Sequence, residues 1–307
     1  MPPEPPVSTA RSRFVSLGGA LRHLLEWGEP GAPVVILQHG IRDHAHSWTW
    51  LAETLKHRYH VIAPDLRGHG DSDWSRDGNY ALASFVLDLA AIADLSGFRD
   101  FSLIGHSLGG QIALRYTAAF PERVRALVAI EGVELPIIRQ EREKPLPFPA
   151  RLREWAAKEM MRRLQTPRYY PDLARAAERM QEANPEIDGE TIAHLTRTGL
   201  IAEADRGFRW KYDNGCRYRP PEDQRGADLD EILTAITCPA LLAYGDESWI
   251  APPPPTRLAH LVRHRVITFG GASHWLHHQR RPEFCELVGR FLADPSSTLA
   301  SERDHYA

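Results

Sequence analysis

The sequence predicts an α/β protein with a doubly wound, mostly parallel sheet. Three observations predict it: short aliphatic runs that are apolar throughout, helical patterns between them, and a sharp Gly-x-Ser-x-Gly turn where one run meets a helix. Strands that are covered by helices on both faces lose the alternation of polar and apolar residues. Alternation of such strands with helices implies right-handed crossovers that place helices on both faces of the sheet.

The elements are expected in the following order. A hairpin over residues 13–17 and 21–27 comes first, with its turn at the glycine pair 18–19. The buried parallel strands follow as six apolar runs, at residues 33–38, 59–64, 101–105, 124–130, 240–244 and 265–269. Helices with one apolar face are expected over residues 80–95, 108–119 and 282–293. The last dozen residues, 296–307, are polar and are expected to be frayed.

The alternation stops between residues 133 and 237. Arg and Glu are frequent there, and amphipathic helical patterns cover residues 151–164, 172–183 and 189–198. A helical segment of this length between two buried strands cannot lie within the sheet. The sequence therefore predicts a core made of residues 1–132 and 238–307, with a helical cap (lid), residues 133–237, inserted before the penultimate core strand.

The composition excludes several classes of function. The 307 residues include 37 Lys plus Arg and 40 Asp plus Glu, a net charge of −3 that gives no drive toward nucleic acid. No run approaches the roughly 20 apolar residues of a membrane span, and the N-terminus lacks the apolar run of a secretory signal. The three cysteines have no CxxC spacing, which argues against a disulfide framework or a zinc site.

These features predict a cytoplasmic protein without a metal or a cofactor. Sparse, unpaired cysteines fit a reducing compartment. His44 and His46 have a metal-like spacing, but no third ligand is evident. The expected partner is a small-molecule ester or acyl substrate, with no nucleic acid and no membrane span. A homodimer is compatible with the sequence.

Ser107 is the expected nucleophile. The apolar run at residues 101–105 leads into Gly105-His106-Ser107-Leu108-Gly109, and a helical pattern begins at Leu108. Between a strand and a helix, this motif places the serine on a sharp turn above the sheet. Flanking side chains would clash in so tight a turn, so both outer positions need glycine. The alternative is a structural glycine turn with an incidental serine.

A serine hydroxyl needs an adjacent base that is held by a third group. His274 is the expected base, because it lies on a loop after the run at residues 265–269, at the carboxyl edge where ligands bind in open α/β sheets. Asp246 directly follows the run at residues 240–244 and is the expected acid, which gives the chain order Ser, Asp, His of this topology. Glu131, after the run at residues 124–130, is the alternative acid.

An oxyanion would be stabilised by backbone N–H groups. The expected donors are Leu108, which follows the nucleophile, and Ile41, on the loop after the run at residues 33–38, where Gly40 lets the backbone approach closely. Position along the chain also predicts the walls of the substrate pocket; the alternative for each tryptophan is core packing. The expected pocket residues are Gly40, Trp48, His106, Trp249 and Trp275. The arginine-rich cap is expected to be a solvated surface, with a channel for acidic substrates as the alternative.

With these motifs the chain resembles the α/β-hydrolase fold superfamily. Within it, the chain is similar to the group of capped esterases, epoxide hydrolases, dehalogenases and carbon–carbon bond hydrolases. The resemblance covers nearly all of the chain outside the cap and the two tails. Besides the triad, His39-Gly40 matches the family's oxyanion element, and residues 65–72, Asp-Leu-Arg-Gly-His-Gly-Asp-Ser, match a turn that is structural in the family. Epoxide hydrolases and dehalogenases of this group use aspartate as nucleophile, whereas this chain has Ser107, so the resemblance implies a serine-nucleophile, esterase-like member.

The expected function is therefore hydrolysis of carboxylic esters or related acyl substrates through an acyl-enzyme. A carbon–carbon bond hydrolase or a lactonase with the same triad is one alternative, in which Arg42 could bind a substrate carboxylate. A non-catalytic ligand-binding protein that kept the fold is another, because fold alone does not imply function. An intact triad argues against that second alternative.

Overall fold

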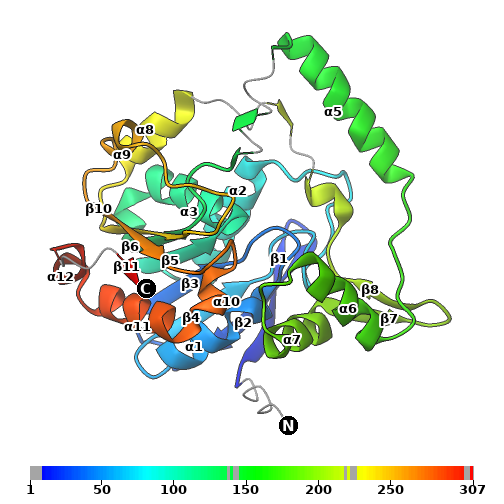
Figure 1. The fold of residues 1–307 in the computed structure, drawn as a ribbon, viewed down its shortest axis with the longest axis horizontal. Coiled ribbons are helices and arrows are strands. Elements are labelled where there is room, and N and C mark those ends of the chain that lie inside the picture. Colours follow the sequence, from blue (N-terminus) through cyan, green and yellow to red (C-terminus); the bar gives the residue numbers. More distant parts are fainter. Residues whose placement is uncertain are drawn as a thin grey trace.

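The computed structural model describes residues 9–136, 139–140, 145–217, 220–221, 227–300 and 305–306. Its centre is a nine-stranded sheet in the order β1-β2-β4-β3-β5-β6-β9-β10-β11 (Figure 1). The β1–β2 and β2–β4 pairs are antiparallel, and the pairs from β4 to β11 are parallel. The doubly wound, mostly parallel sheet predicted from the sequence is confirmed.

The strands occupy the predicted runs. The amino-terminal hairpin is β1 (Arg11–Leu17) and β2 (Ala20–Trp27). The parallel part comprises β3 (Val34–Gln38), β4 (His60–Pro64), β5 (Phe101–His106), β6 (Val124–Ile130), β9 (Ala240–Gly245) and β10 (His264–Phe269). Every residue of β4, β5 and β9 is buried, which explains why these runs carry no polar alternation.

Helices cover both faces of the sheet and create two apolar cores. One face packs against α2 (Leu82–Leu95), α3 (Leu108–Ala119) and α8 (Ala227–Ala235). The other packs against α1 (Thr49–Leu55) and α11 (Arg281–Ala293). The short helices α9 (Pro255–Leu258) and α10 (Leu276–Gln279) follow β9 and β10. This arrangement leaves the carboxyl ends of β3, β5, β6 and β10 free to carry loops.

The segment predicted as a cap contains the expected helices: α5 (Phe148–Arg163), α6 (Leu173–Ala183) and α7 (Gly189–Gly199). It also contains a hairpin that the sequence analysis missed, β7 (Leu200–Glu203) with β8 (Gly207–Trp210), which forms its own two-stranded sheet. Leu229 and Leu233 of α8 pack into the main core, so the last part of the predicted cap lies on the sheet. The exact division into core and cap remains a prediction.

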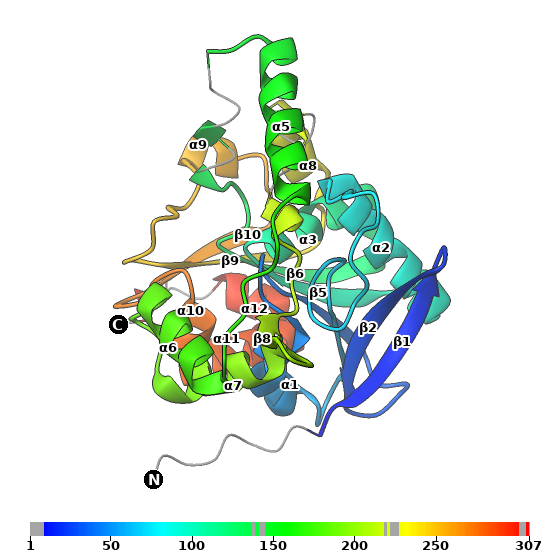
Figure 2. The ribbon, with the colours of Figure 1, turned by 90° about the vertical axis from the view of Figure 1, so that its right-hand side faces the viewer.

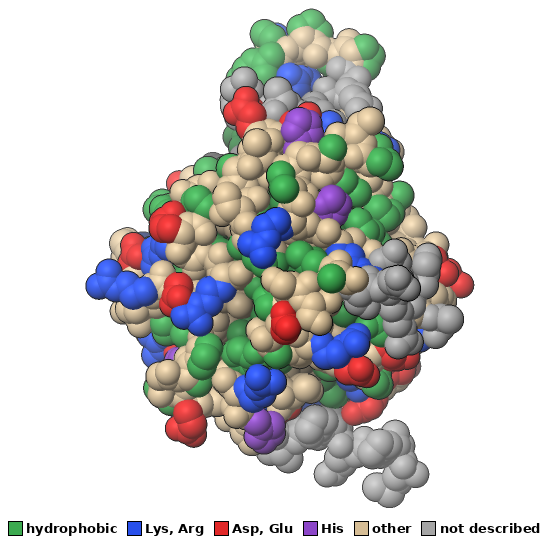
Figure 3. Space-filling view, turned by 90° about the vertical axis from the view of Figure 1, so that its left-hand side faces the viewer, with side chains coloured by type: hydrophobic (Ala, Val, Ile, Leu, Met, Phe, Trp, Pro, Cys, Tyr) green, Lys and Arg blue, Asp and Glu red, His purple; other side chains and the backbone are tan. Residues whose placement is uncertain are grey.

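The α6–α7 pair and α5 take different positions. Figures 1 and 2 show α6 and α7 beside the loops that follow β3 and β10, whereas α5 projects from the body. The space-filling view shows the molecule narrowing to a projection with hydrophobic side chains near its tip (Figure 3). The exposed large apolar residues of α5 are Phe148, Leu152, Met160 and Met161. We therefore call only α6, α7 and the β7–β8 hairpin the lid, residues 170–210.

The carboxyl terminus is more ordered than predicted. Residues 295–300 form α12 (Pro295–Ala300), and β11 (His305–Tyr306) pairs with β10. Tyr306 is buried, and its ring stacks on Phe269 with centroids 5.1 Å apart. The expectation of a frayed tail was wrong here because one aromatic side chain packs against the edge of the core. No helix among the described residues is both long and apolar enough to cross a membrane.

Candidate active site

Ser107 lies at the junction of β5 and α3. Its backbone has φ of 53° and ψ of −113°, a conformation that residues other than glycine rarely adopt. The surrounding glycines permit this turn. A Cβ at Gly105 would lie 2.3 Å from the Gly109 carbonyl oxygen, and one at Gly109 would lie 2.0 Å from that of Gln38. The predicted need for glycine at both positions is thus explained by backbone atoms that approach too closely for any side chain. Backbone strain of this kind costs about 1–3 kcal/mol and is concentrated at functional sites.

His274 is held by a buried carboxylate. Its Nδ1 lies 2.6 Å from Oε2 of Glu131, a residue that is fully buried directly after β6. The Glu131 carboxylate also accepts hydrogen bonds from Gly245 N at 2.9 Å and from Ser248 Oγ at 2.6 Å. The bonds from Gly245 and Ser248 hold the carboxylate in place, and the carboxylate in turn holds the Nδ1 edge of the His274 ring.

Asp246, the predicted acid, is not the partner of His274. Its side chain is exposed, and within the described part of the chain its Oδ1 accepts one long hydrogen bond, of 3.4 Å from the Ala272 backbone. Glu131 takes the position because its backbone adopts a left-handed conformation with φ of 47°, and its longer side chain crosses the end of β9 to reach the loop after β10. The prediction of Asp246 was therefore wrong, and the alternative acid that the sequence offered is the one in contact.

The loop that carries His274 packs against His106, the neighbour of Ser107 in sequence. His106, which precedes the serine, donates a hydrogen bond from Nε2 to the His274 carbonyl oxygen at 2.9 Å, and the two imidazole centroids are 4.6 Å apart. Among the described residues, no hydrogen bond joins Ser107 Oγ to the His274 ring. Hydrogen bonds of this kind are often long without substrate and tighten when it binds.

The loop after β3 lies against the serine. A Cβ on Gly40 would come within 3.5 Å of the Ser107 Cβ and within 2.9 Å of His106 Nδ1, so the backbone passes the nucleophile turn closely. Leu108 is the first residue of α3, where backbone N–H groups have no partner within the helix. Neither the Ile41 nor the Leu108 N–H bonds to another group in the described part of the chain. Both therefore remain candidate donors to an oxyanion.

The other predicted pocket residues are distributed differently. Trp275 lines a pocket, and its Nε1 donates to Asn184 Oδ1 of the lid at 3.1 Å. Trp249 is 58% exposed and lies beside His274, with centroids 5.3 Å apart. The other two do not line this pocket. Trp48 packs in the core on the α1–α11 face, and His106 is buried behind the His274 loop, where burial holds the pKa of its imidazole well below the usual range.

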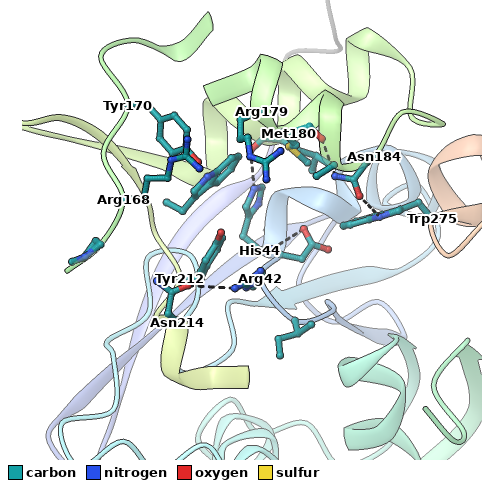
Figure 4. A pocket seen from close by; sticks show the side chains of 16 residues that line it. Arg42, His44, Arg168, Tyr170, Arg179, Met180, Asn184, Tyr212, Asn214 and Trp275 are labelled. Carbon is teal, nitrogen blue, oxygen red and sulfur yellow. Dashed lines mark hydrogen bonds between the residues drawn. The ribbon is translucent and has the colours of Figure 1, made fainter. Parts of the chain in front are cut away.

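A pocket of about 450 Å³ lies between the loop after β3 and the lid (Figure 4), and its lining includes Ile41 and Trp275 but neither Ser107 nor His274. The core contributes Ile41, Arg42, Asp43, His44 and Trp275. Most of the opposite wall was missed by sequence analysis: Pro167, Arg168, Tyr170, Arg179, Met180, Ala183, Asn184, Leu195, Trp210, Tyr212 and Asn214. These residues come from segments whose placement over the core depends on tertiary packing, so no local signal marked them.

One side-chain group has the spacing of a metal site in the described part of the chain: His23, Asp65 and Asp71. The Asp65 carboxylate is already hydrogen-bonded to His23 Nδ1 at 2.7 Å, to Ala45 N at 2.7 Å and to Asp71 N at 2.9 Å. Such bonds lower the pKa of Asp65 despite its burial. They fasten the turn at residues 65–72 to β2 and to the loop after β3, which is a structural role.

The chain resembles known hydrolases in sequence and in fold. The chain is 27% identical to epoxide hydrolase A of Mycobacterium tuberculosis, over 91% of this chain and 96% of that protein. It is 36% identical to lipase LipV of the same organism, over 36% of this chain and 41% of that protein. A thioesterase domain from the curacin biosynthetic pathway superimposes with a TM-score of 0.74 and 25% identity, over 91% of this chain and 99% of that domain. A family model described as alpha/beta hydrolase fold matches residues 33–280, and the chain belongs to that family.

Proposed function

We propose that this chain is a serine hydrolase that cleaves carboxylic esters or related acyl substrates. Ser107 is the nucleophile, His274 the base and Glu131 the acid that orients it. The observation that carries the proposal is the 2.6 Å hydrogen bond between His274 Nδ1 and the buried Glu131 carboxylate. A carboxylate at Nδ1 directs the other ring nitrogen, Nε2, toward the role of proton acceptor.

The reaction follows from these groups. Ser107 Oγ attacks the acyl carbon while His274 Nε2 takes the hydroxyl proton, and Glu131 stabilises the imidazolium that forms. The Ile41 and Leu108 N–H groups stabilise the negative charge on the former carbonyl oxygen. His274 then protonates the leaving alcohol, and the acyl–oxygen bond breaks. Water, deprotonated by His274, cleaves the acyl-enzyme and releases a carboxylic acid.

Relatives of this chain include proteins named for lipase, thioesterase and epoxide hydrolase activity, which together support a hydrolase. Acyl transfer is favoured over epoxide opening by the residue at the turn between β5 and α3. A serine there forms an acyl-enzyme that water can hydrolyse, whereas attack by a serine on an epoxide would leave a stable ether.

A fluorophosphonate probe tests the nucleophile, because only an activated serine attacks phosphorus quickly. We expect intact-mass labelling of the wild-type protein at one site and no labelling of Ser107→Ala. Ser273→Ala is the matched control, since Ser273 adjoins His274 in sequence but lies outside the turn, and it should label like the wild type. Labelling that persists in Ser107→Ala would refute the assignment. A wild-type protein that neither labels nor cleaves activated esters would favour the non-catalytic alternative.

A further inference from the structure

The pocket of Figure 4 contains three arginines that the proposed mechanism does not use. Arg42 comes from the loop after β3, Arg179 from α6, and Arg168 from the segment that precedes α6. They surround a space whose other walls include aromatic rings, among them Tyr170, Tyr212 and Trp275. All three side chains are exposed to solvent, so their N–H groups are accessible to an anionic ligand that enters the cavity.

Two of these arginines have no acidic partner in the part of the chain that the structure describes. The Arg42 guanidinium lies 5.3 Å from the centroid of the Tyr212 ring, and its Nη2 is 3.5 Å from Asn214 Oδ1. Arg168 lies 5.3 Å from the centroid of the Tyr170 ring. Neither forms an ion pair with any carboxylate among the described residues, whereas Arg179 pairs with Glu182 at 3.1 Å.

Two arginines on the lid that lie outside the pocket form ion pairs. Arg175 on α6 pairs with Glu178 at 2.7 Å, and Arg209 on β8 pairs with Glu203. Arg42 and Arg168 differ from these two arginines, and from Arg179, because they have no carboxylate partner among the described residues. A guanidinium stacked on a tyrosine face keeps its edge N–H groups available for bidentate binding of a carboxylate or a phosphate.

The backbone of Arg42 supports a functional role for its side chain. Arg42 adopts a left-handed conformation, with φ of 60°, which non-glycine residues seldom do. It directly follows Ile41, the proposed oxyanion donor. Figure 4 shows its side chain extending toward Tyr212 and Asn214, across the space between the core and the lid. Ile41 and Trp275, which follows His274 in sequence, line the same pocket, so an anion held by Arg42 would adjoin the loop of the proposed oxyanion donor.

The acidic residue in the pocket wall does not cancel this charge. Asp43 is buried, its Oδ1 accepts a hydrogen bond from His44 N at 2.8 Å, and burial raises the pKa of its carboxyl to about 7. His44 contributes no charge near neutral pH, because burial lowers the pKa of its imidazole to about 4. The cavity therefore has a net positive charge at neutral pH.

We infer that this pocket selects substrates that carry an anionic group, a carboxylate or a phosphate, which Arg42 and Arg168 bind while Ser107 attacks the ester carbonyl. The inference rests on the proposed serine-hydrolase function and specifies its substrate class. The anion takes no part in bond making. Water still adds across the acyl–oxygen bond, and an acid and an alcohol leave.

The test compares two substrates of equal chain length, 4-nitrophenyl hydrogen adipate and 4-nitrophenyl methyl adipate, by release of 4-nitrophenolate. We expect the wild type to prefer the anionic ester at least tenfold in kcat/KM. In the double variant Arg42→Gln/Arg168→Gln this preference should fall at least tenfold, mainly through KM. Arg175→Gln is the matched control, because Arg175 is exposed on the same lid and outside the pocket, and it should keep the wild-type ratio.

Two inhibitors separate the sources of the anion. Stronger competitive inhibition by adipate than by phenyl phosphate indicates a carboxylate site, and the reverse indicates a phosphate site. If the wild type cleaves both esters equally well, or if the ratio survives the double variant, the inference is overturned while the proposed function stands. If neither ester is cleaved and Ser107 is not labelled by the fluorophosphonate, it is the proposed function that fails.

Discussion

Replacing Glu131 by Gln should be far more damaging to catalysis than replacing Asp246 by Asn. Oε1 of Glu131 accepts from Gly245 N, while Oε2 accepts from both Ser248 Oγ and His274 Nδ1. A glutamine has one oxygen for these two positions. If its oxygen faces Gly245, its NH₂ group faces His274 and imposes the wrong tautomer. If its oxygen faces His274, two N–H donors meet at Gly245.

The magnitude follows from comparison with a serine protease triad, where the acid-to-amide change lowers kcat by roughly 10⁴. We expect Glu131→Gln to lower kcat by about 10³–10⁴, which corresponds to about 4–5.5 kcal/mol at 1.36 kcal/mol per tenfold change. KM should change little, because the lost interaction acts in the transition state. The exposed Asp246→Asn should stay within about threefold of the wild type, as expected for a surface substitution.

The assay is steady-state hydrolysis of one activated ester by both variants. Circular dichroism and urea unfolding provide the control, because loss of hydrogen bonds at the buried Glu131 also costs about 1–3 kcal/mol of stability. The reasoning would be refuted if Glu131→Gln folds and keeps a near wild-type kcat while Asp246→Asn loses most of its activity. Asp246, on the loop after β9, would then be the acid.

Three further predictions concern stability and are each measured by urea unfolding. Gly109→Ala should lower the free energy of unfolding by more than about 3 kcal/mol or prevent folding, because its Cβ would lie 2.0 Å from the Gln38 carbonyl oxygen. Gly289 lies at an open position in α11, so the control variant Gly289→Ala should be neutral or stabilising by up to about 1 kcal/mol. His277 is buried with its imidazole pKa well below the usual range, so below about pH 6.5 the unfolded chain binds a proton that the folded chain does not, and stability falls as the pH falls. His277→Leu should reduce this slope by up to about 1.4 kcal/mol per pH unit, and an unchanged slope would contradict the assignment. Tyr306→Ala should cost about 3 kcal/mol by removing a buried, stacked ring, whereas equal stability would mean that β11 does not dock in solution.

The sheet could be predicted because each strand has its own signal in a short stretch of sequence. A run such as residues 124–130 is apolar throughout, and only a strand covered on both faces needs that pattern. The nucleophile turn was equally local, since Gly105 and Gly109 flank Ser107 within five residues. The β7–β8 hairpin was not predicted, because each of its strands has only four residues and lies outside the main sheet.

The choice between Asp246 and Glu131 could not be made in the same way. Both residues directly follow neighbouring parallel strands, so the pattern of the sequence treats them alike. The difference lies in a backbone angle at residue 131 and in how the loop after β10 approaches β9, and both arise only when the sheet is assembled. The arginine wall of the pocket was hidden for a related reason, because Arg42 and Arg168 are distant in sequence and meet only when the lid packs over the core.

The position of Glu131 has a consequence for how the site could be divided or rebuilt. The proposed nucleophile and the proposed acid both precede the inserted segment, and His274, the proposed base, follows it. A chain that ends just after β6 would therefore already contain two of the three groups. The inserted segment lies between these two groups and His274. Two fragments, one ending and one beginning within the loop at residues 204–206 between β7 and β8, could be tested for complementation, with activity as the signal that the late strands β9 and β10 have joined the early ones. In engineering terms, segments could be exchanged between β6 and β9 while leaving the carboxylate and the serine on one uninterrupted stretch of chain.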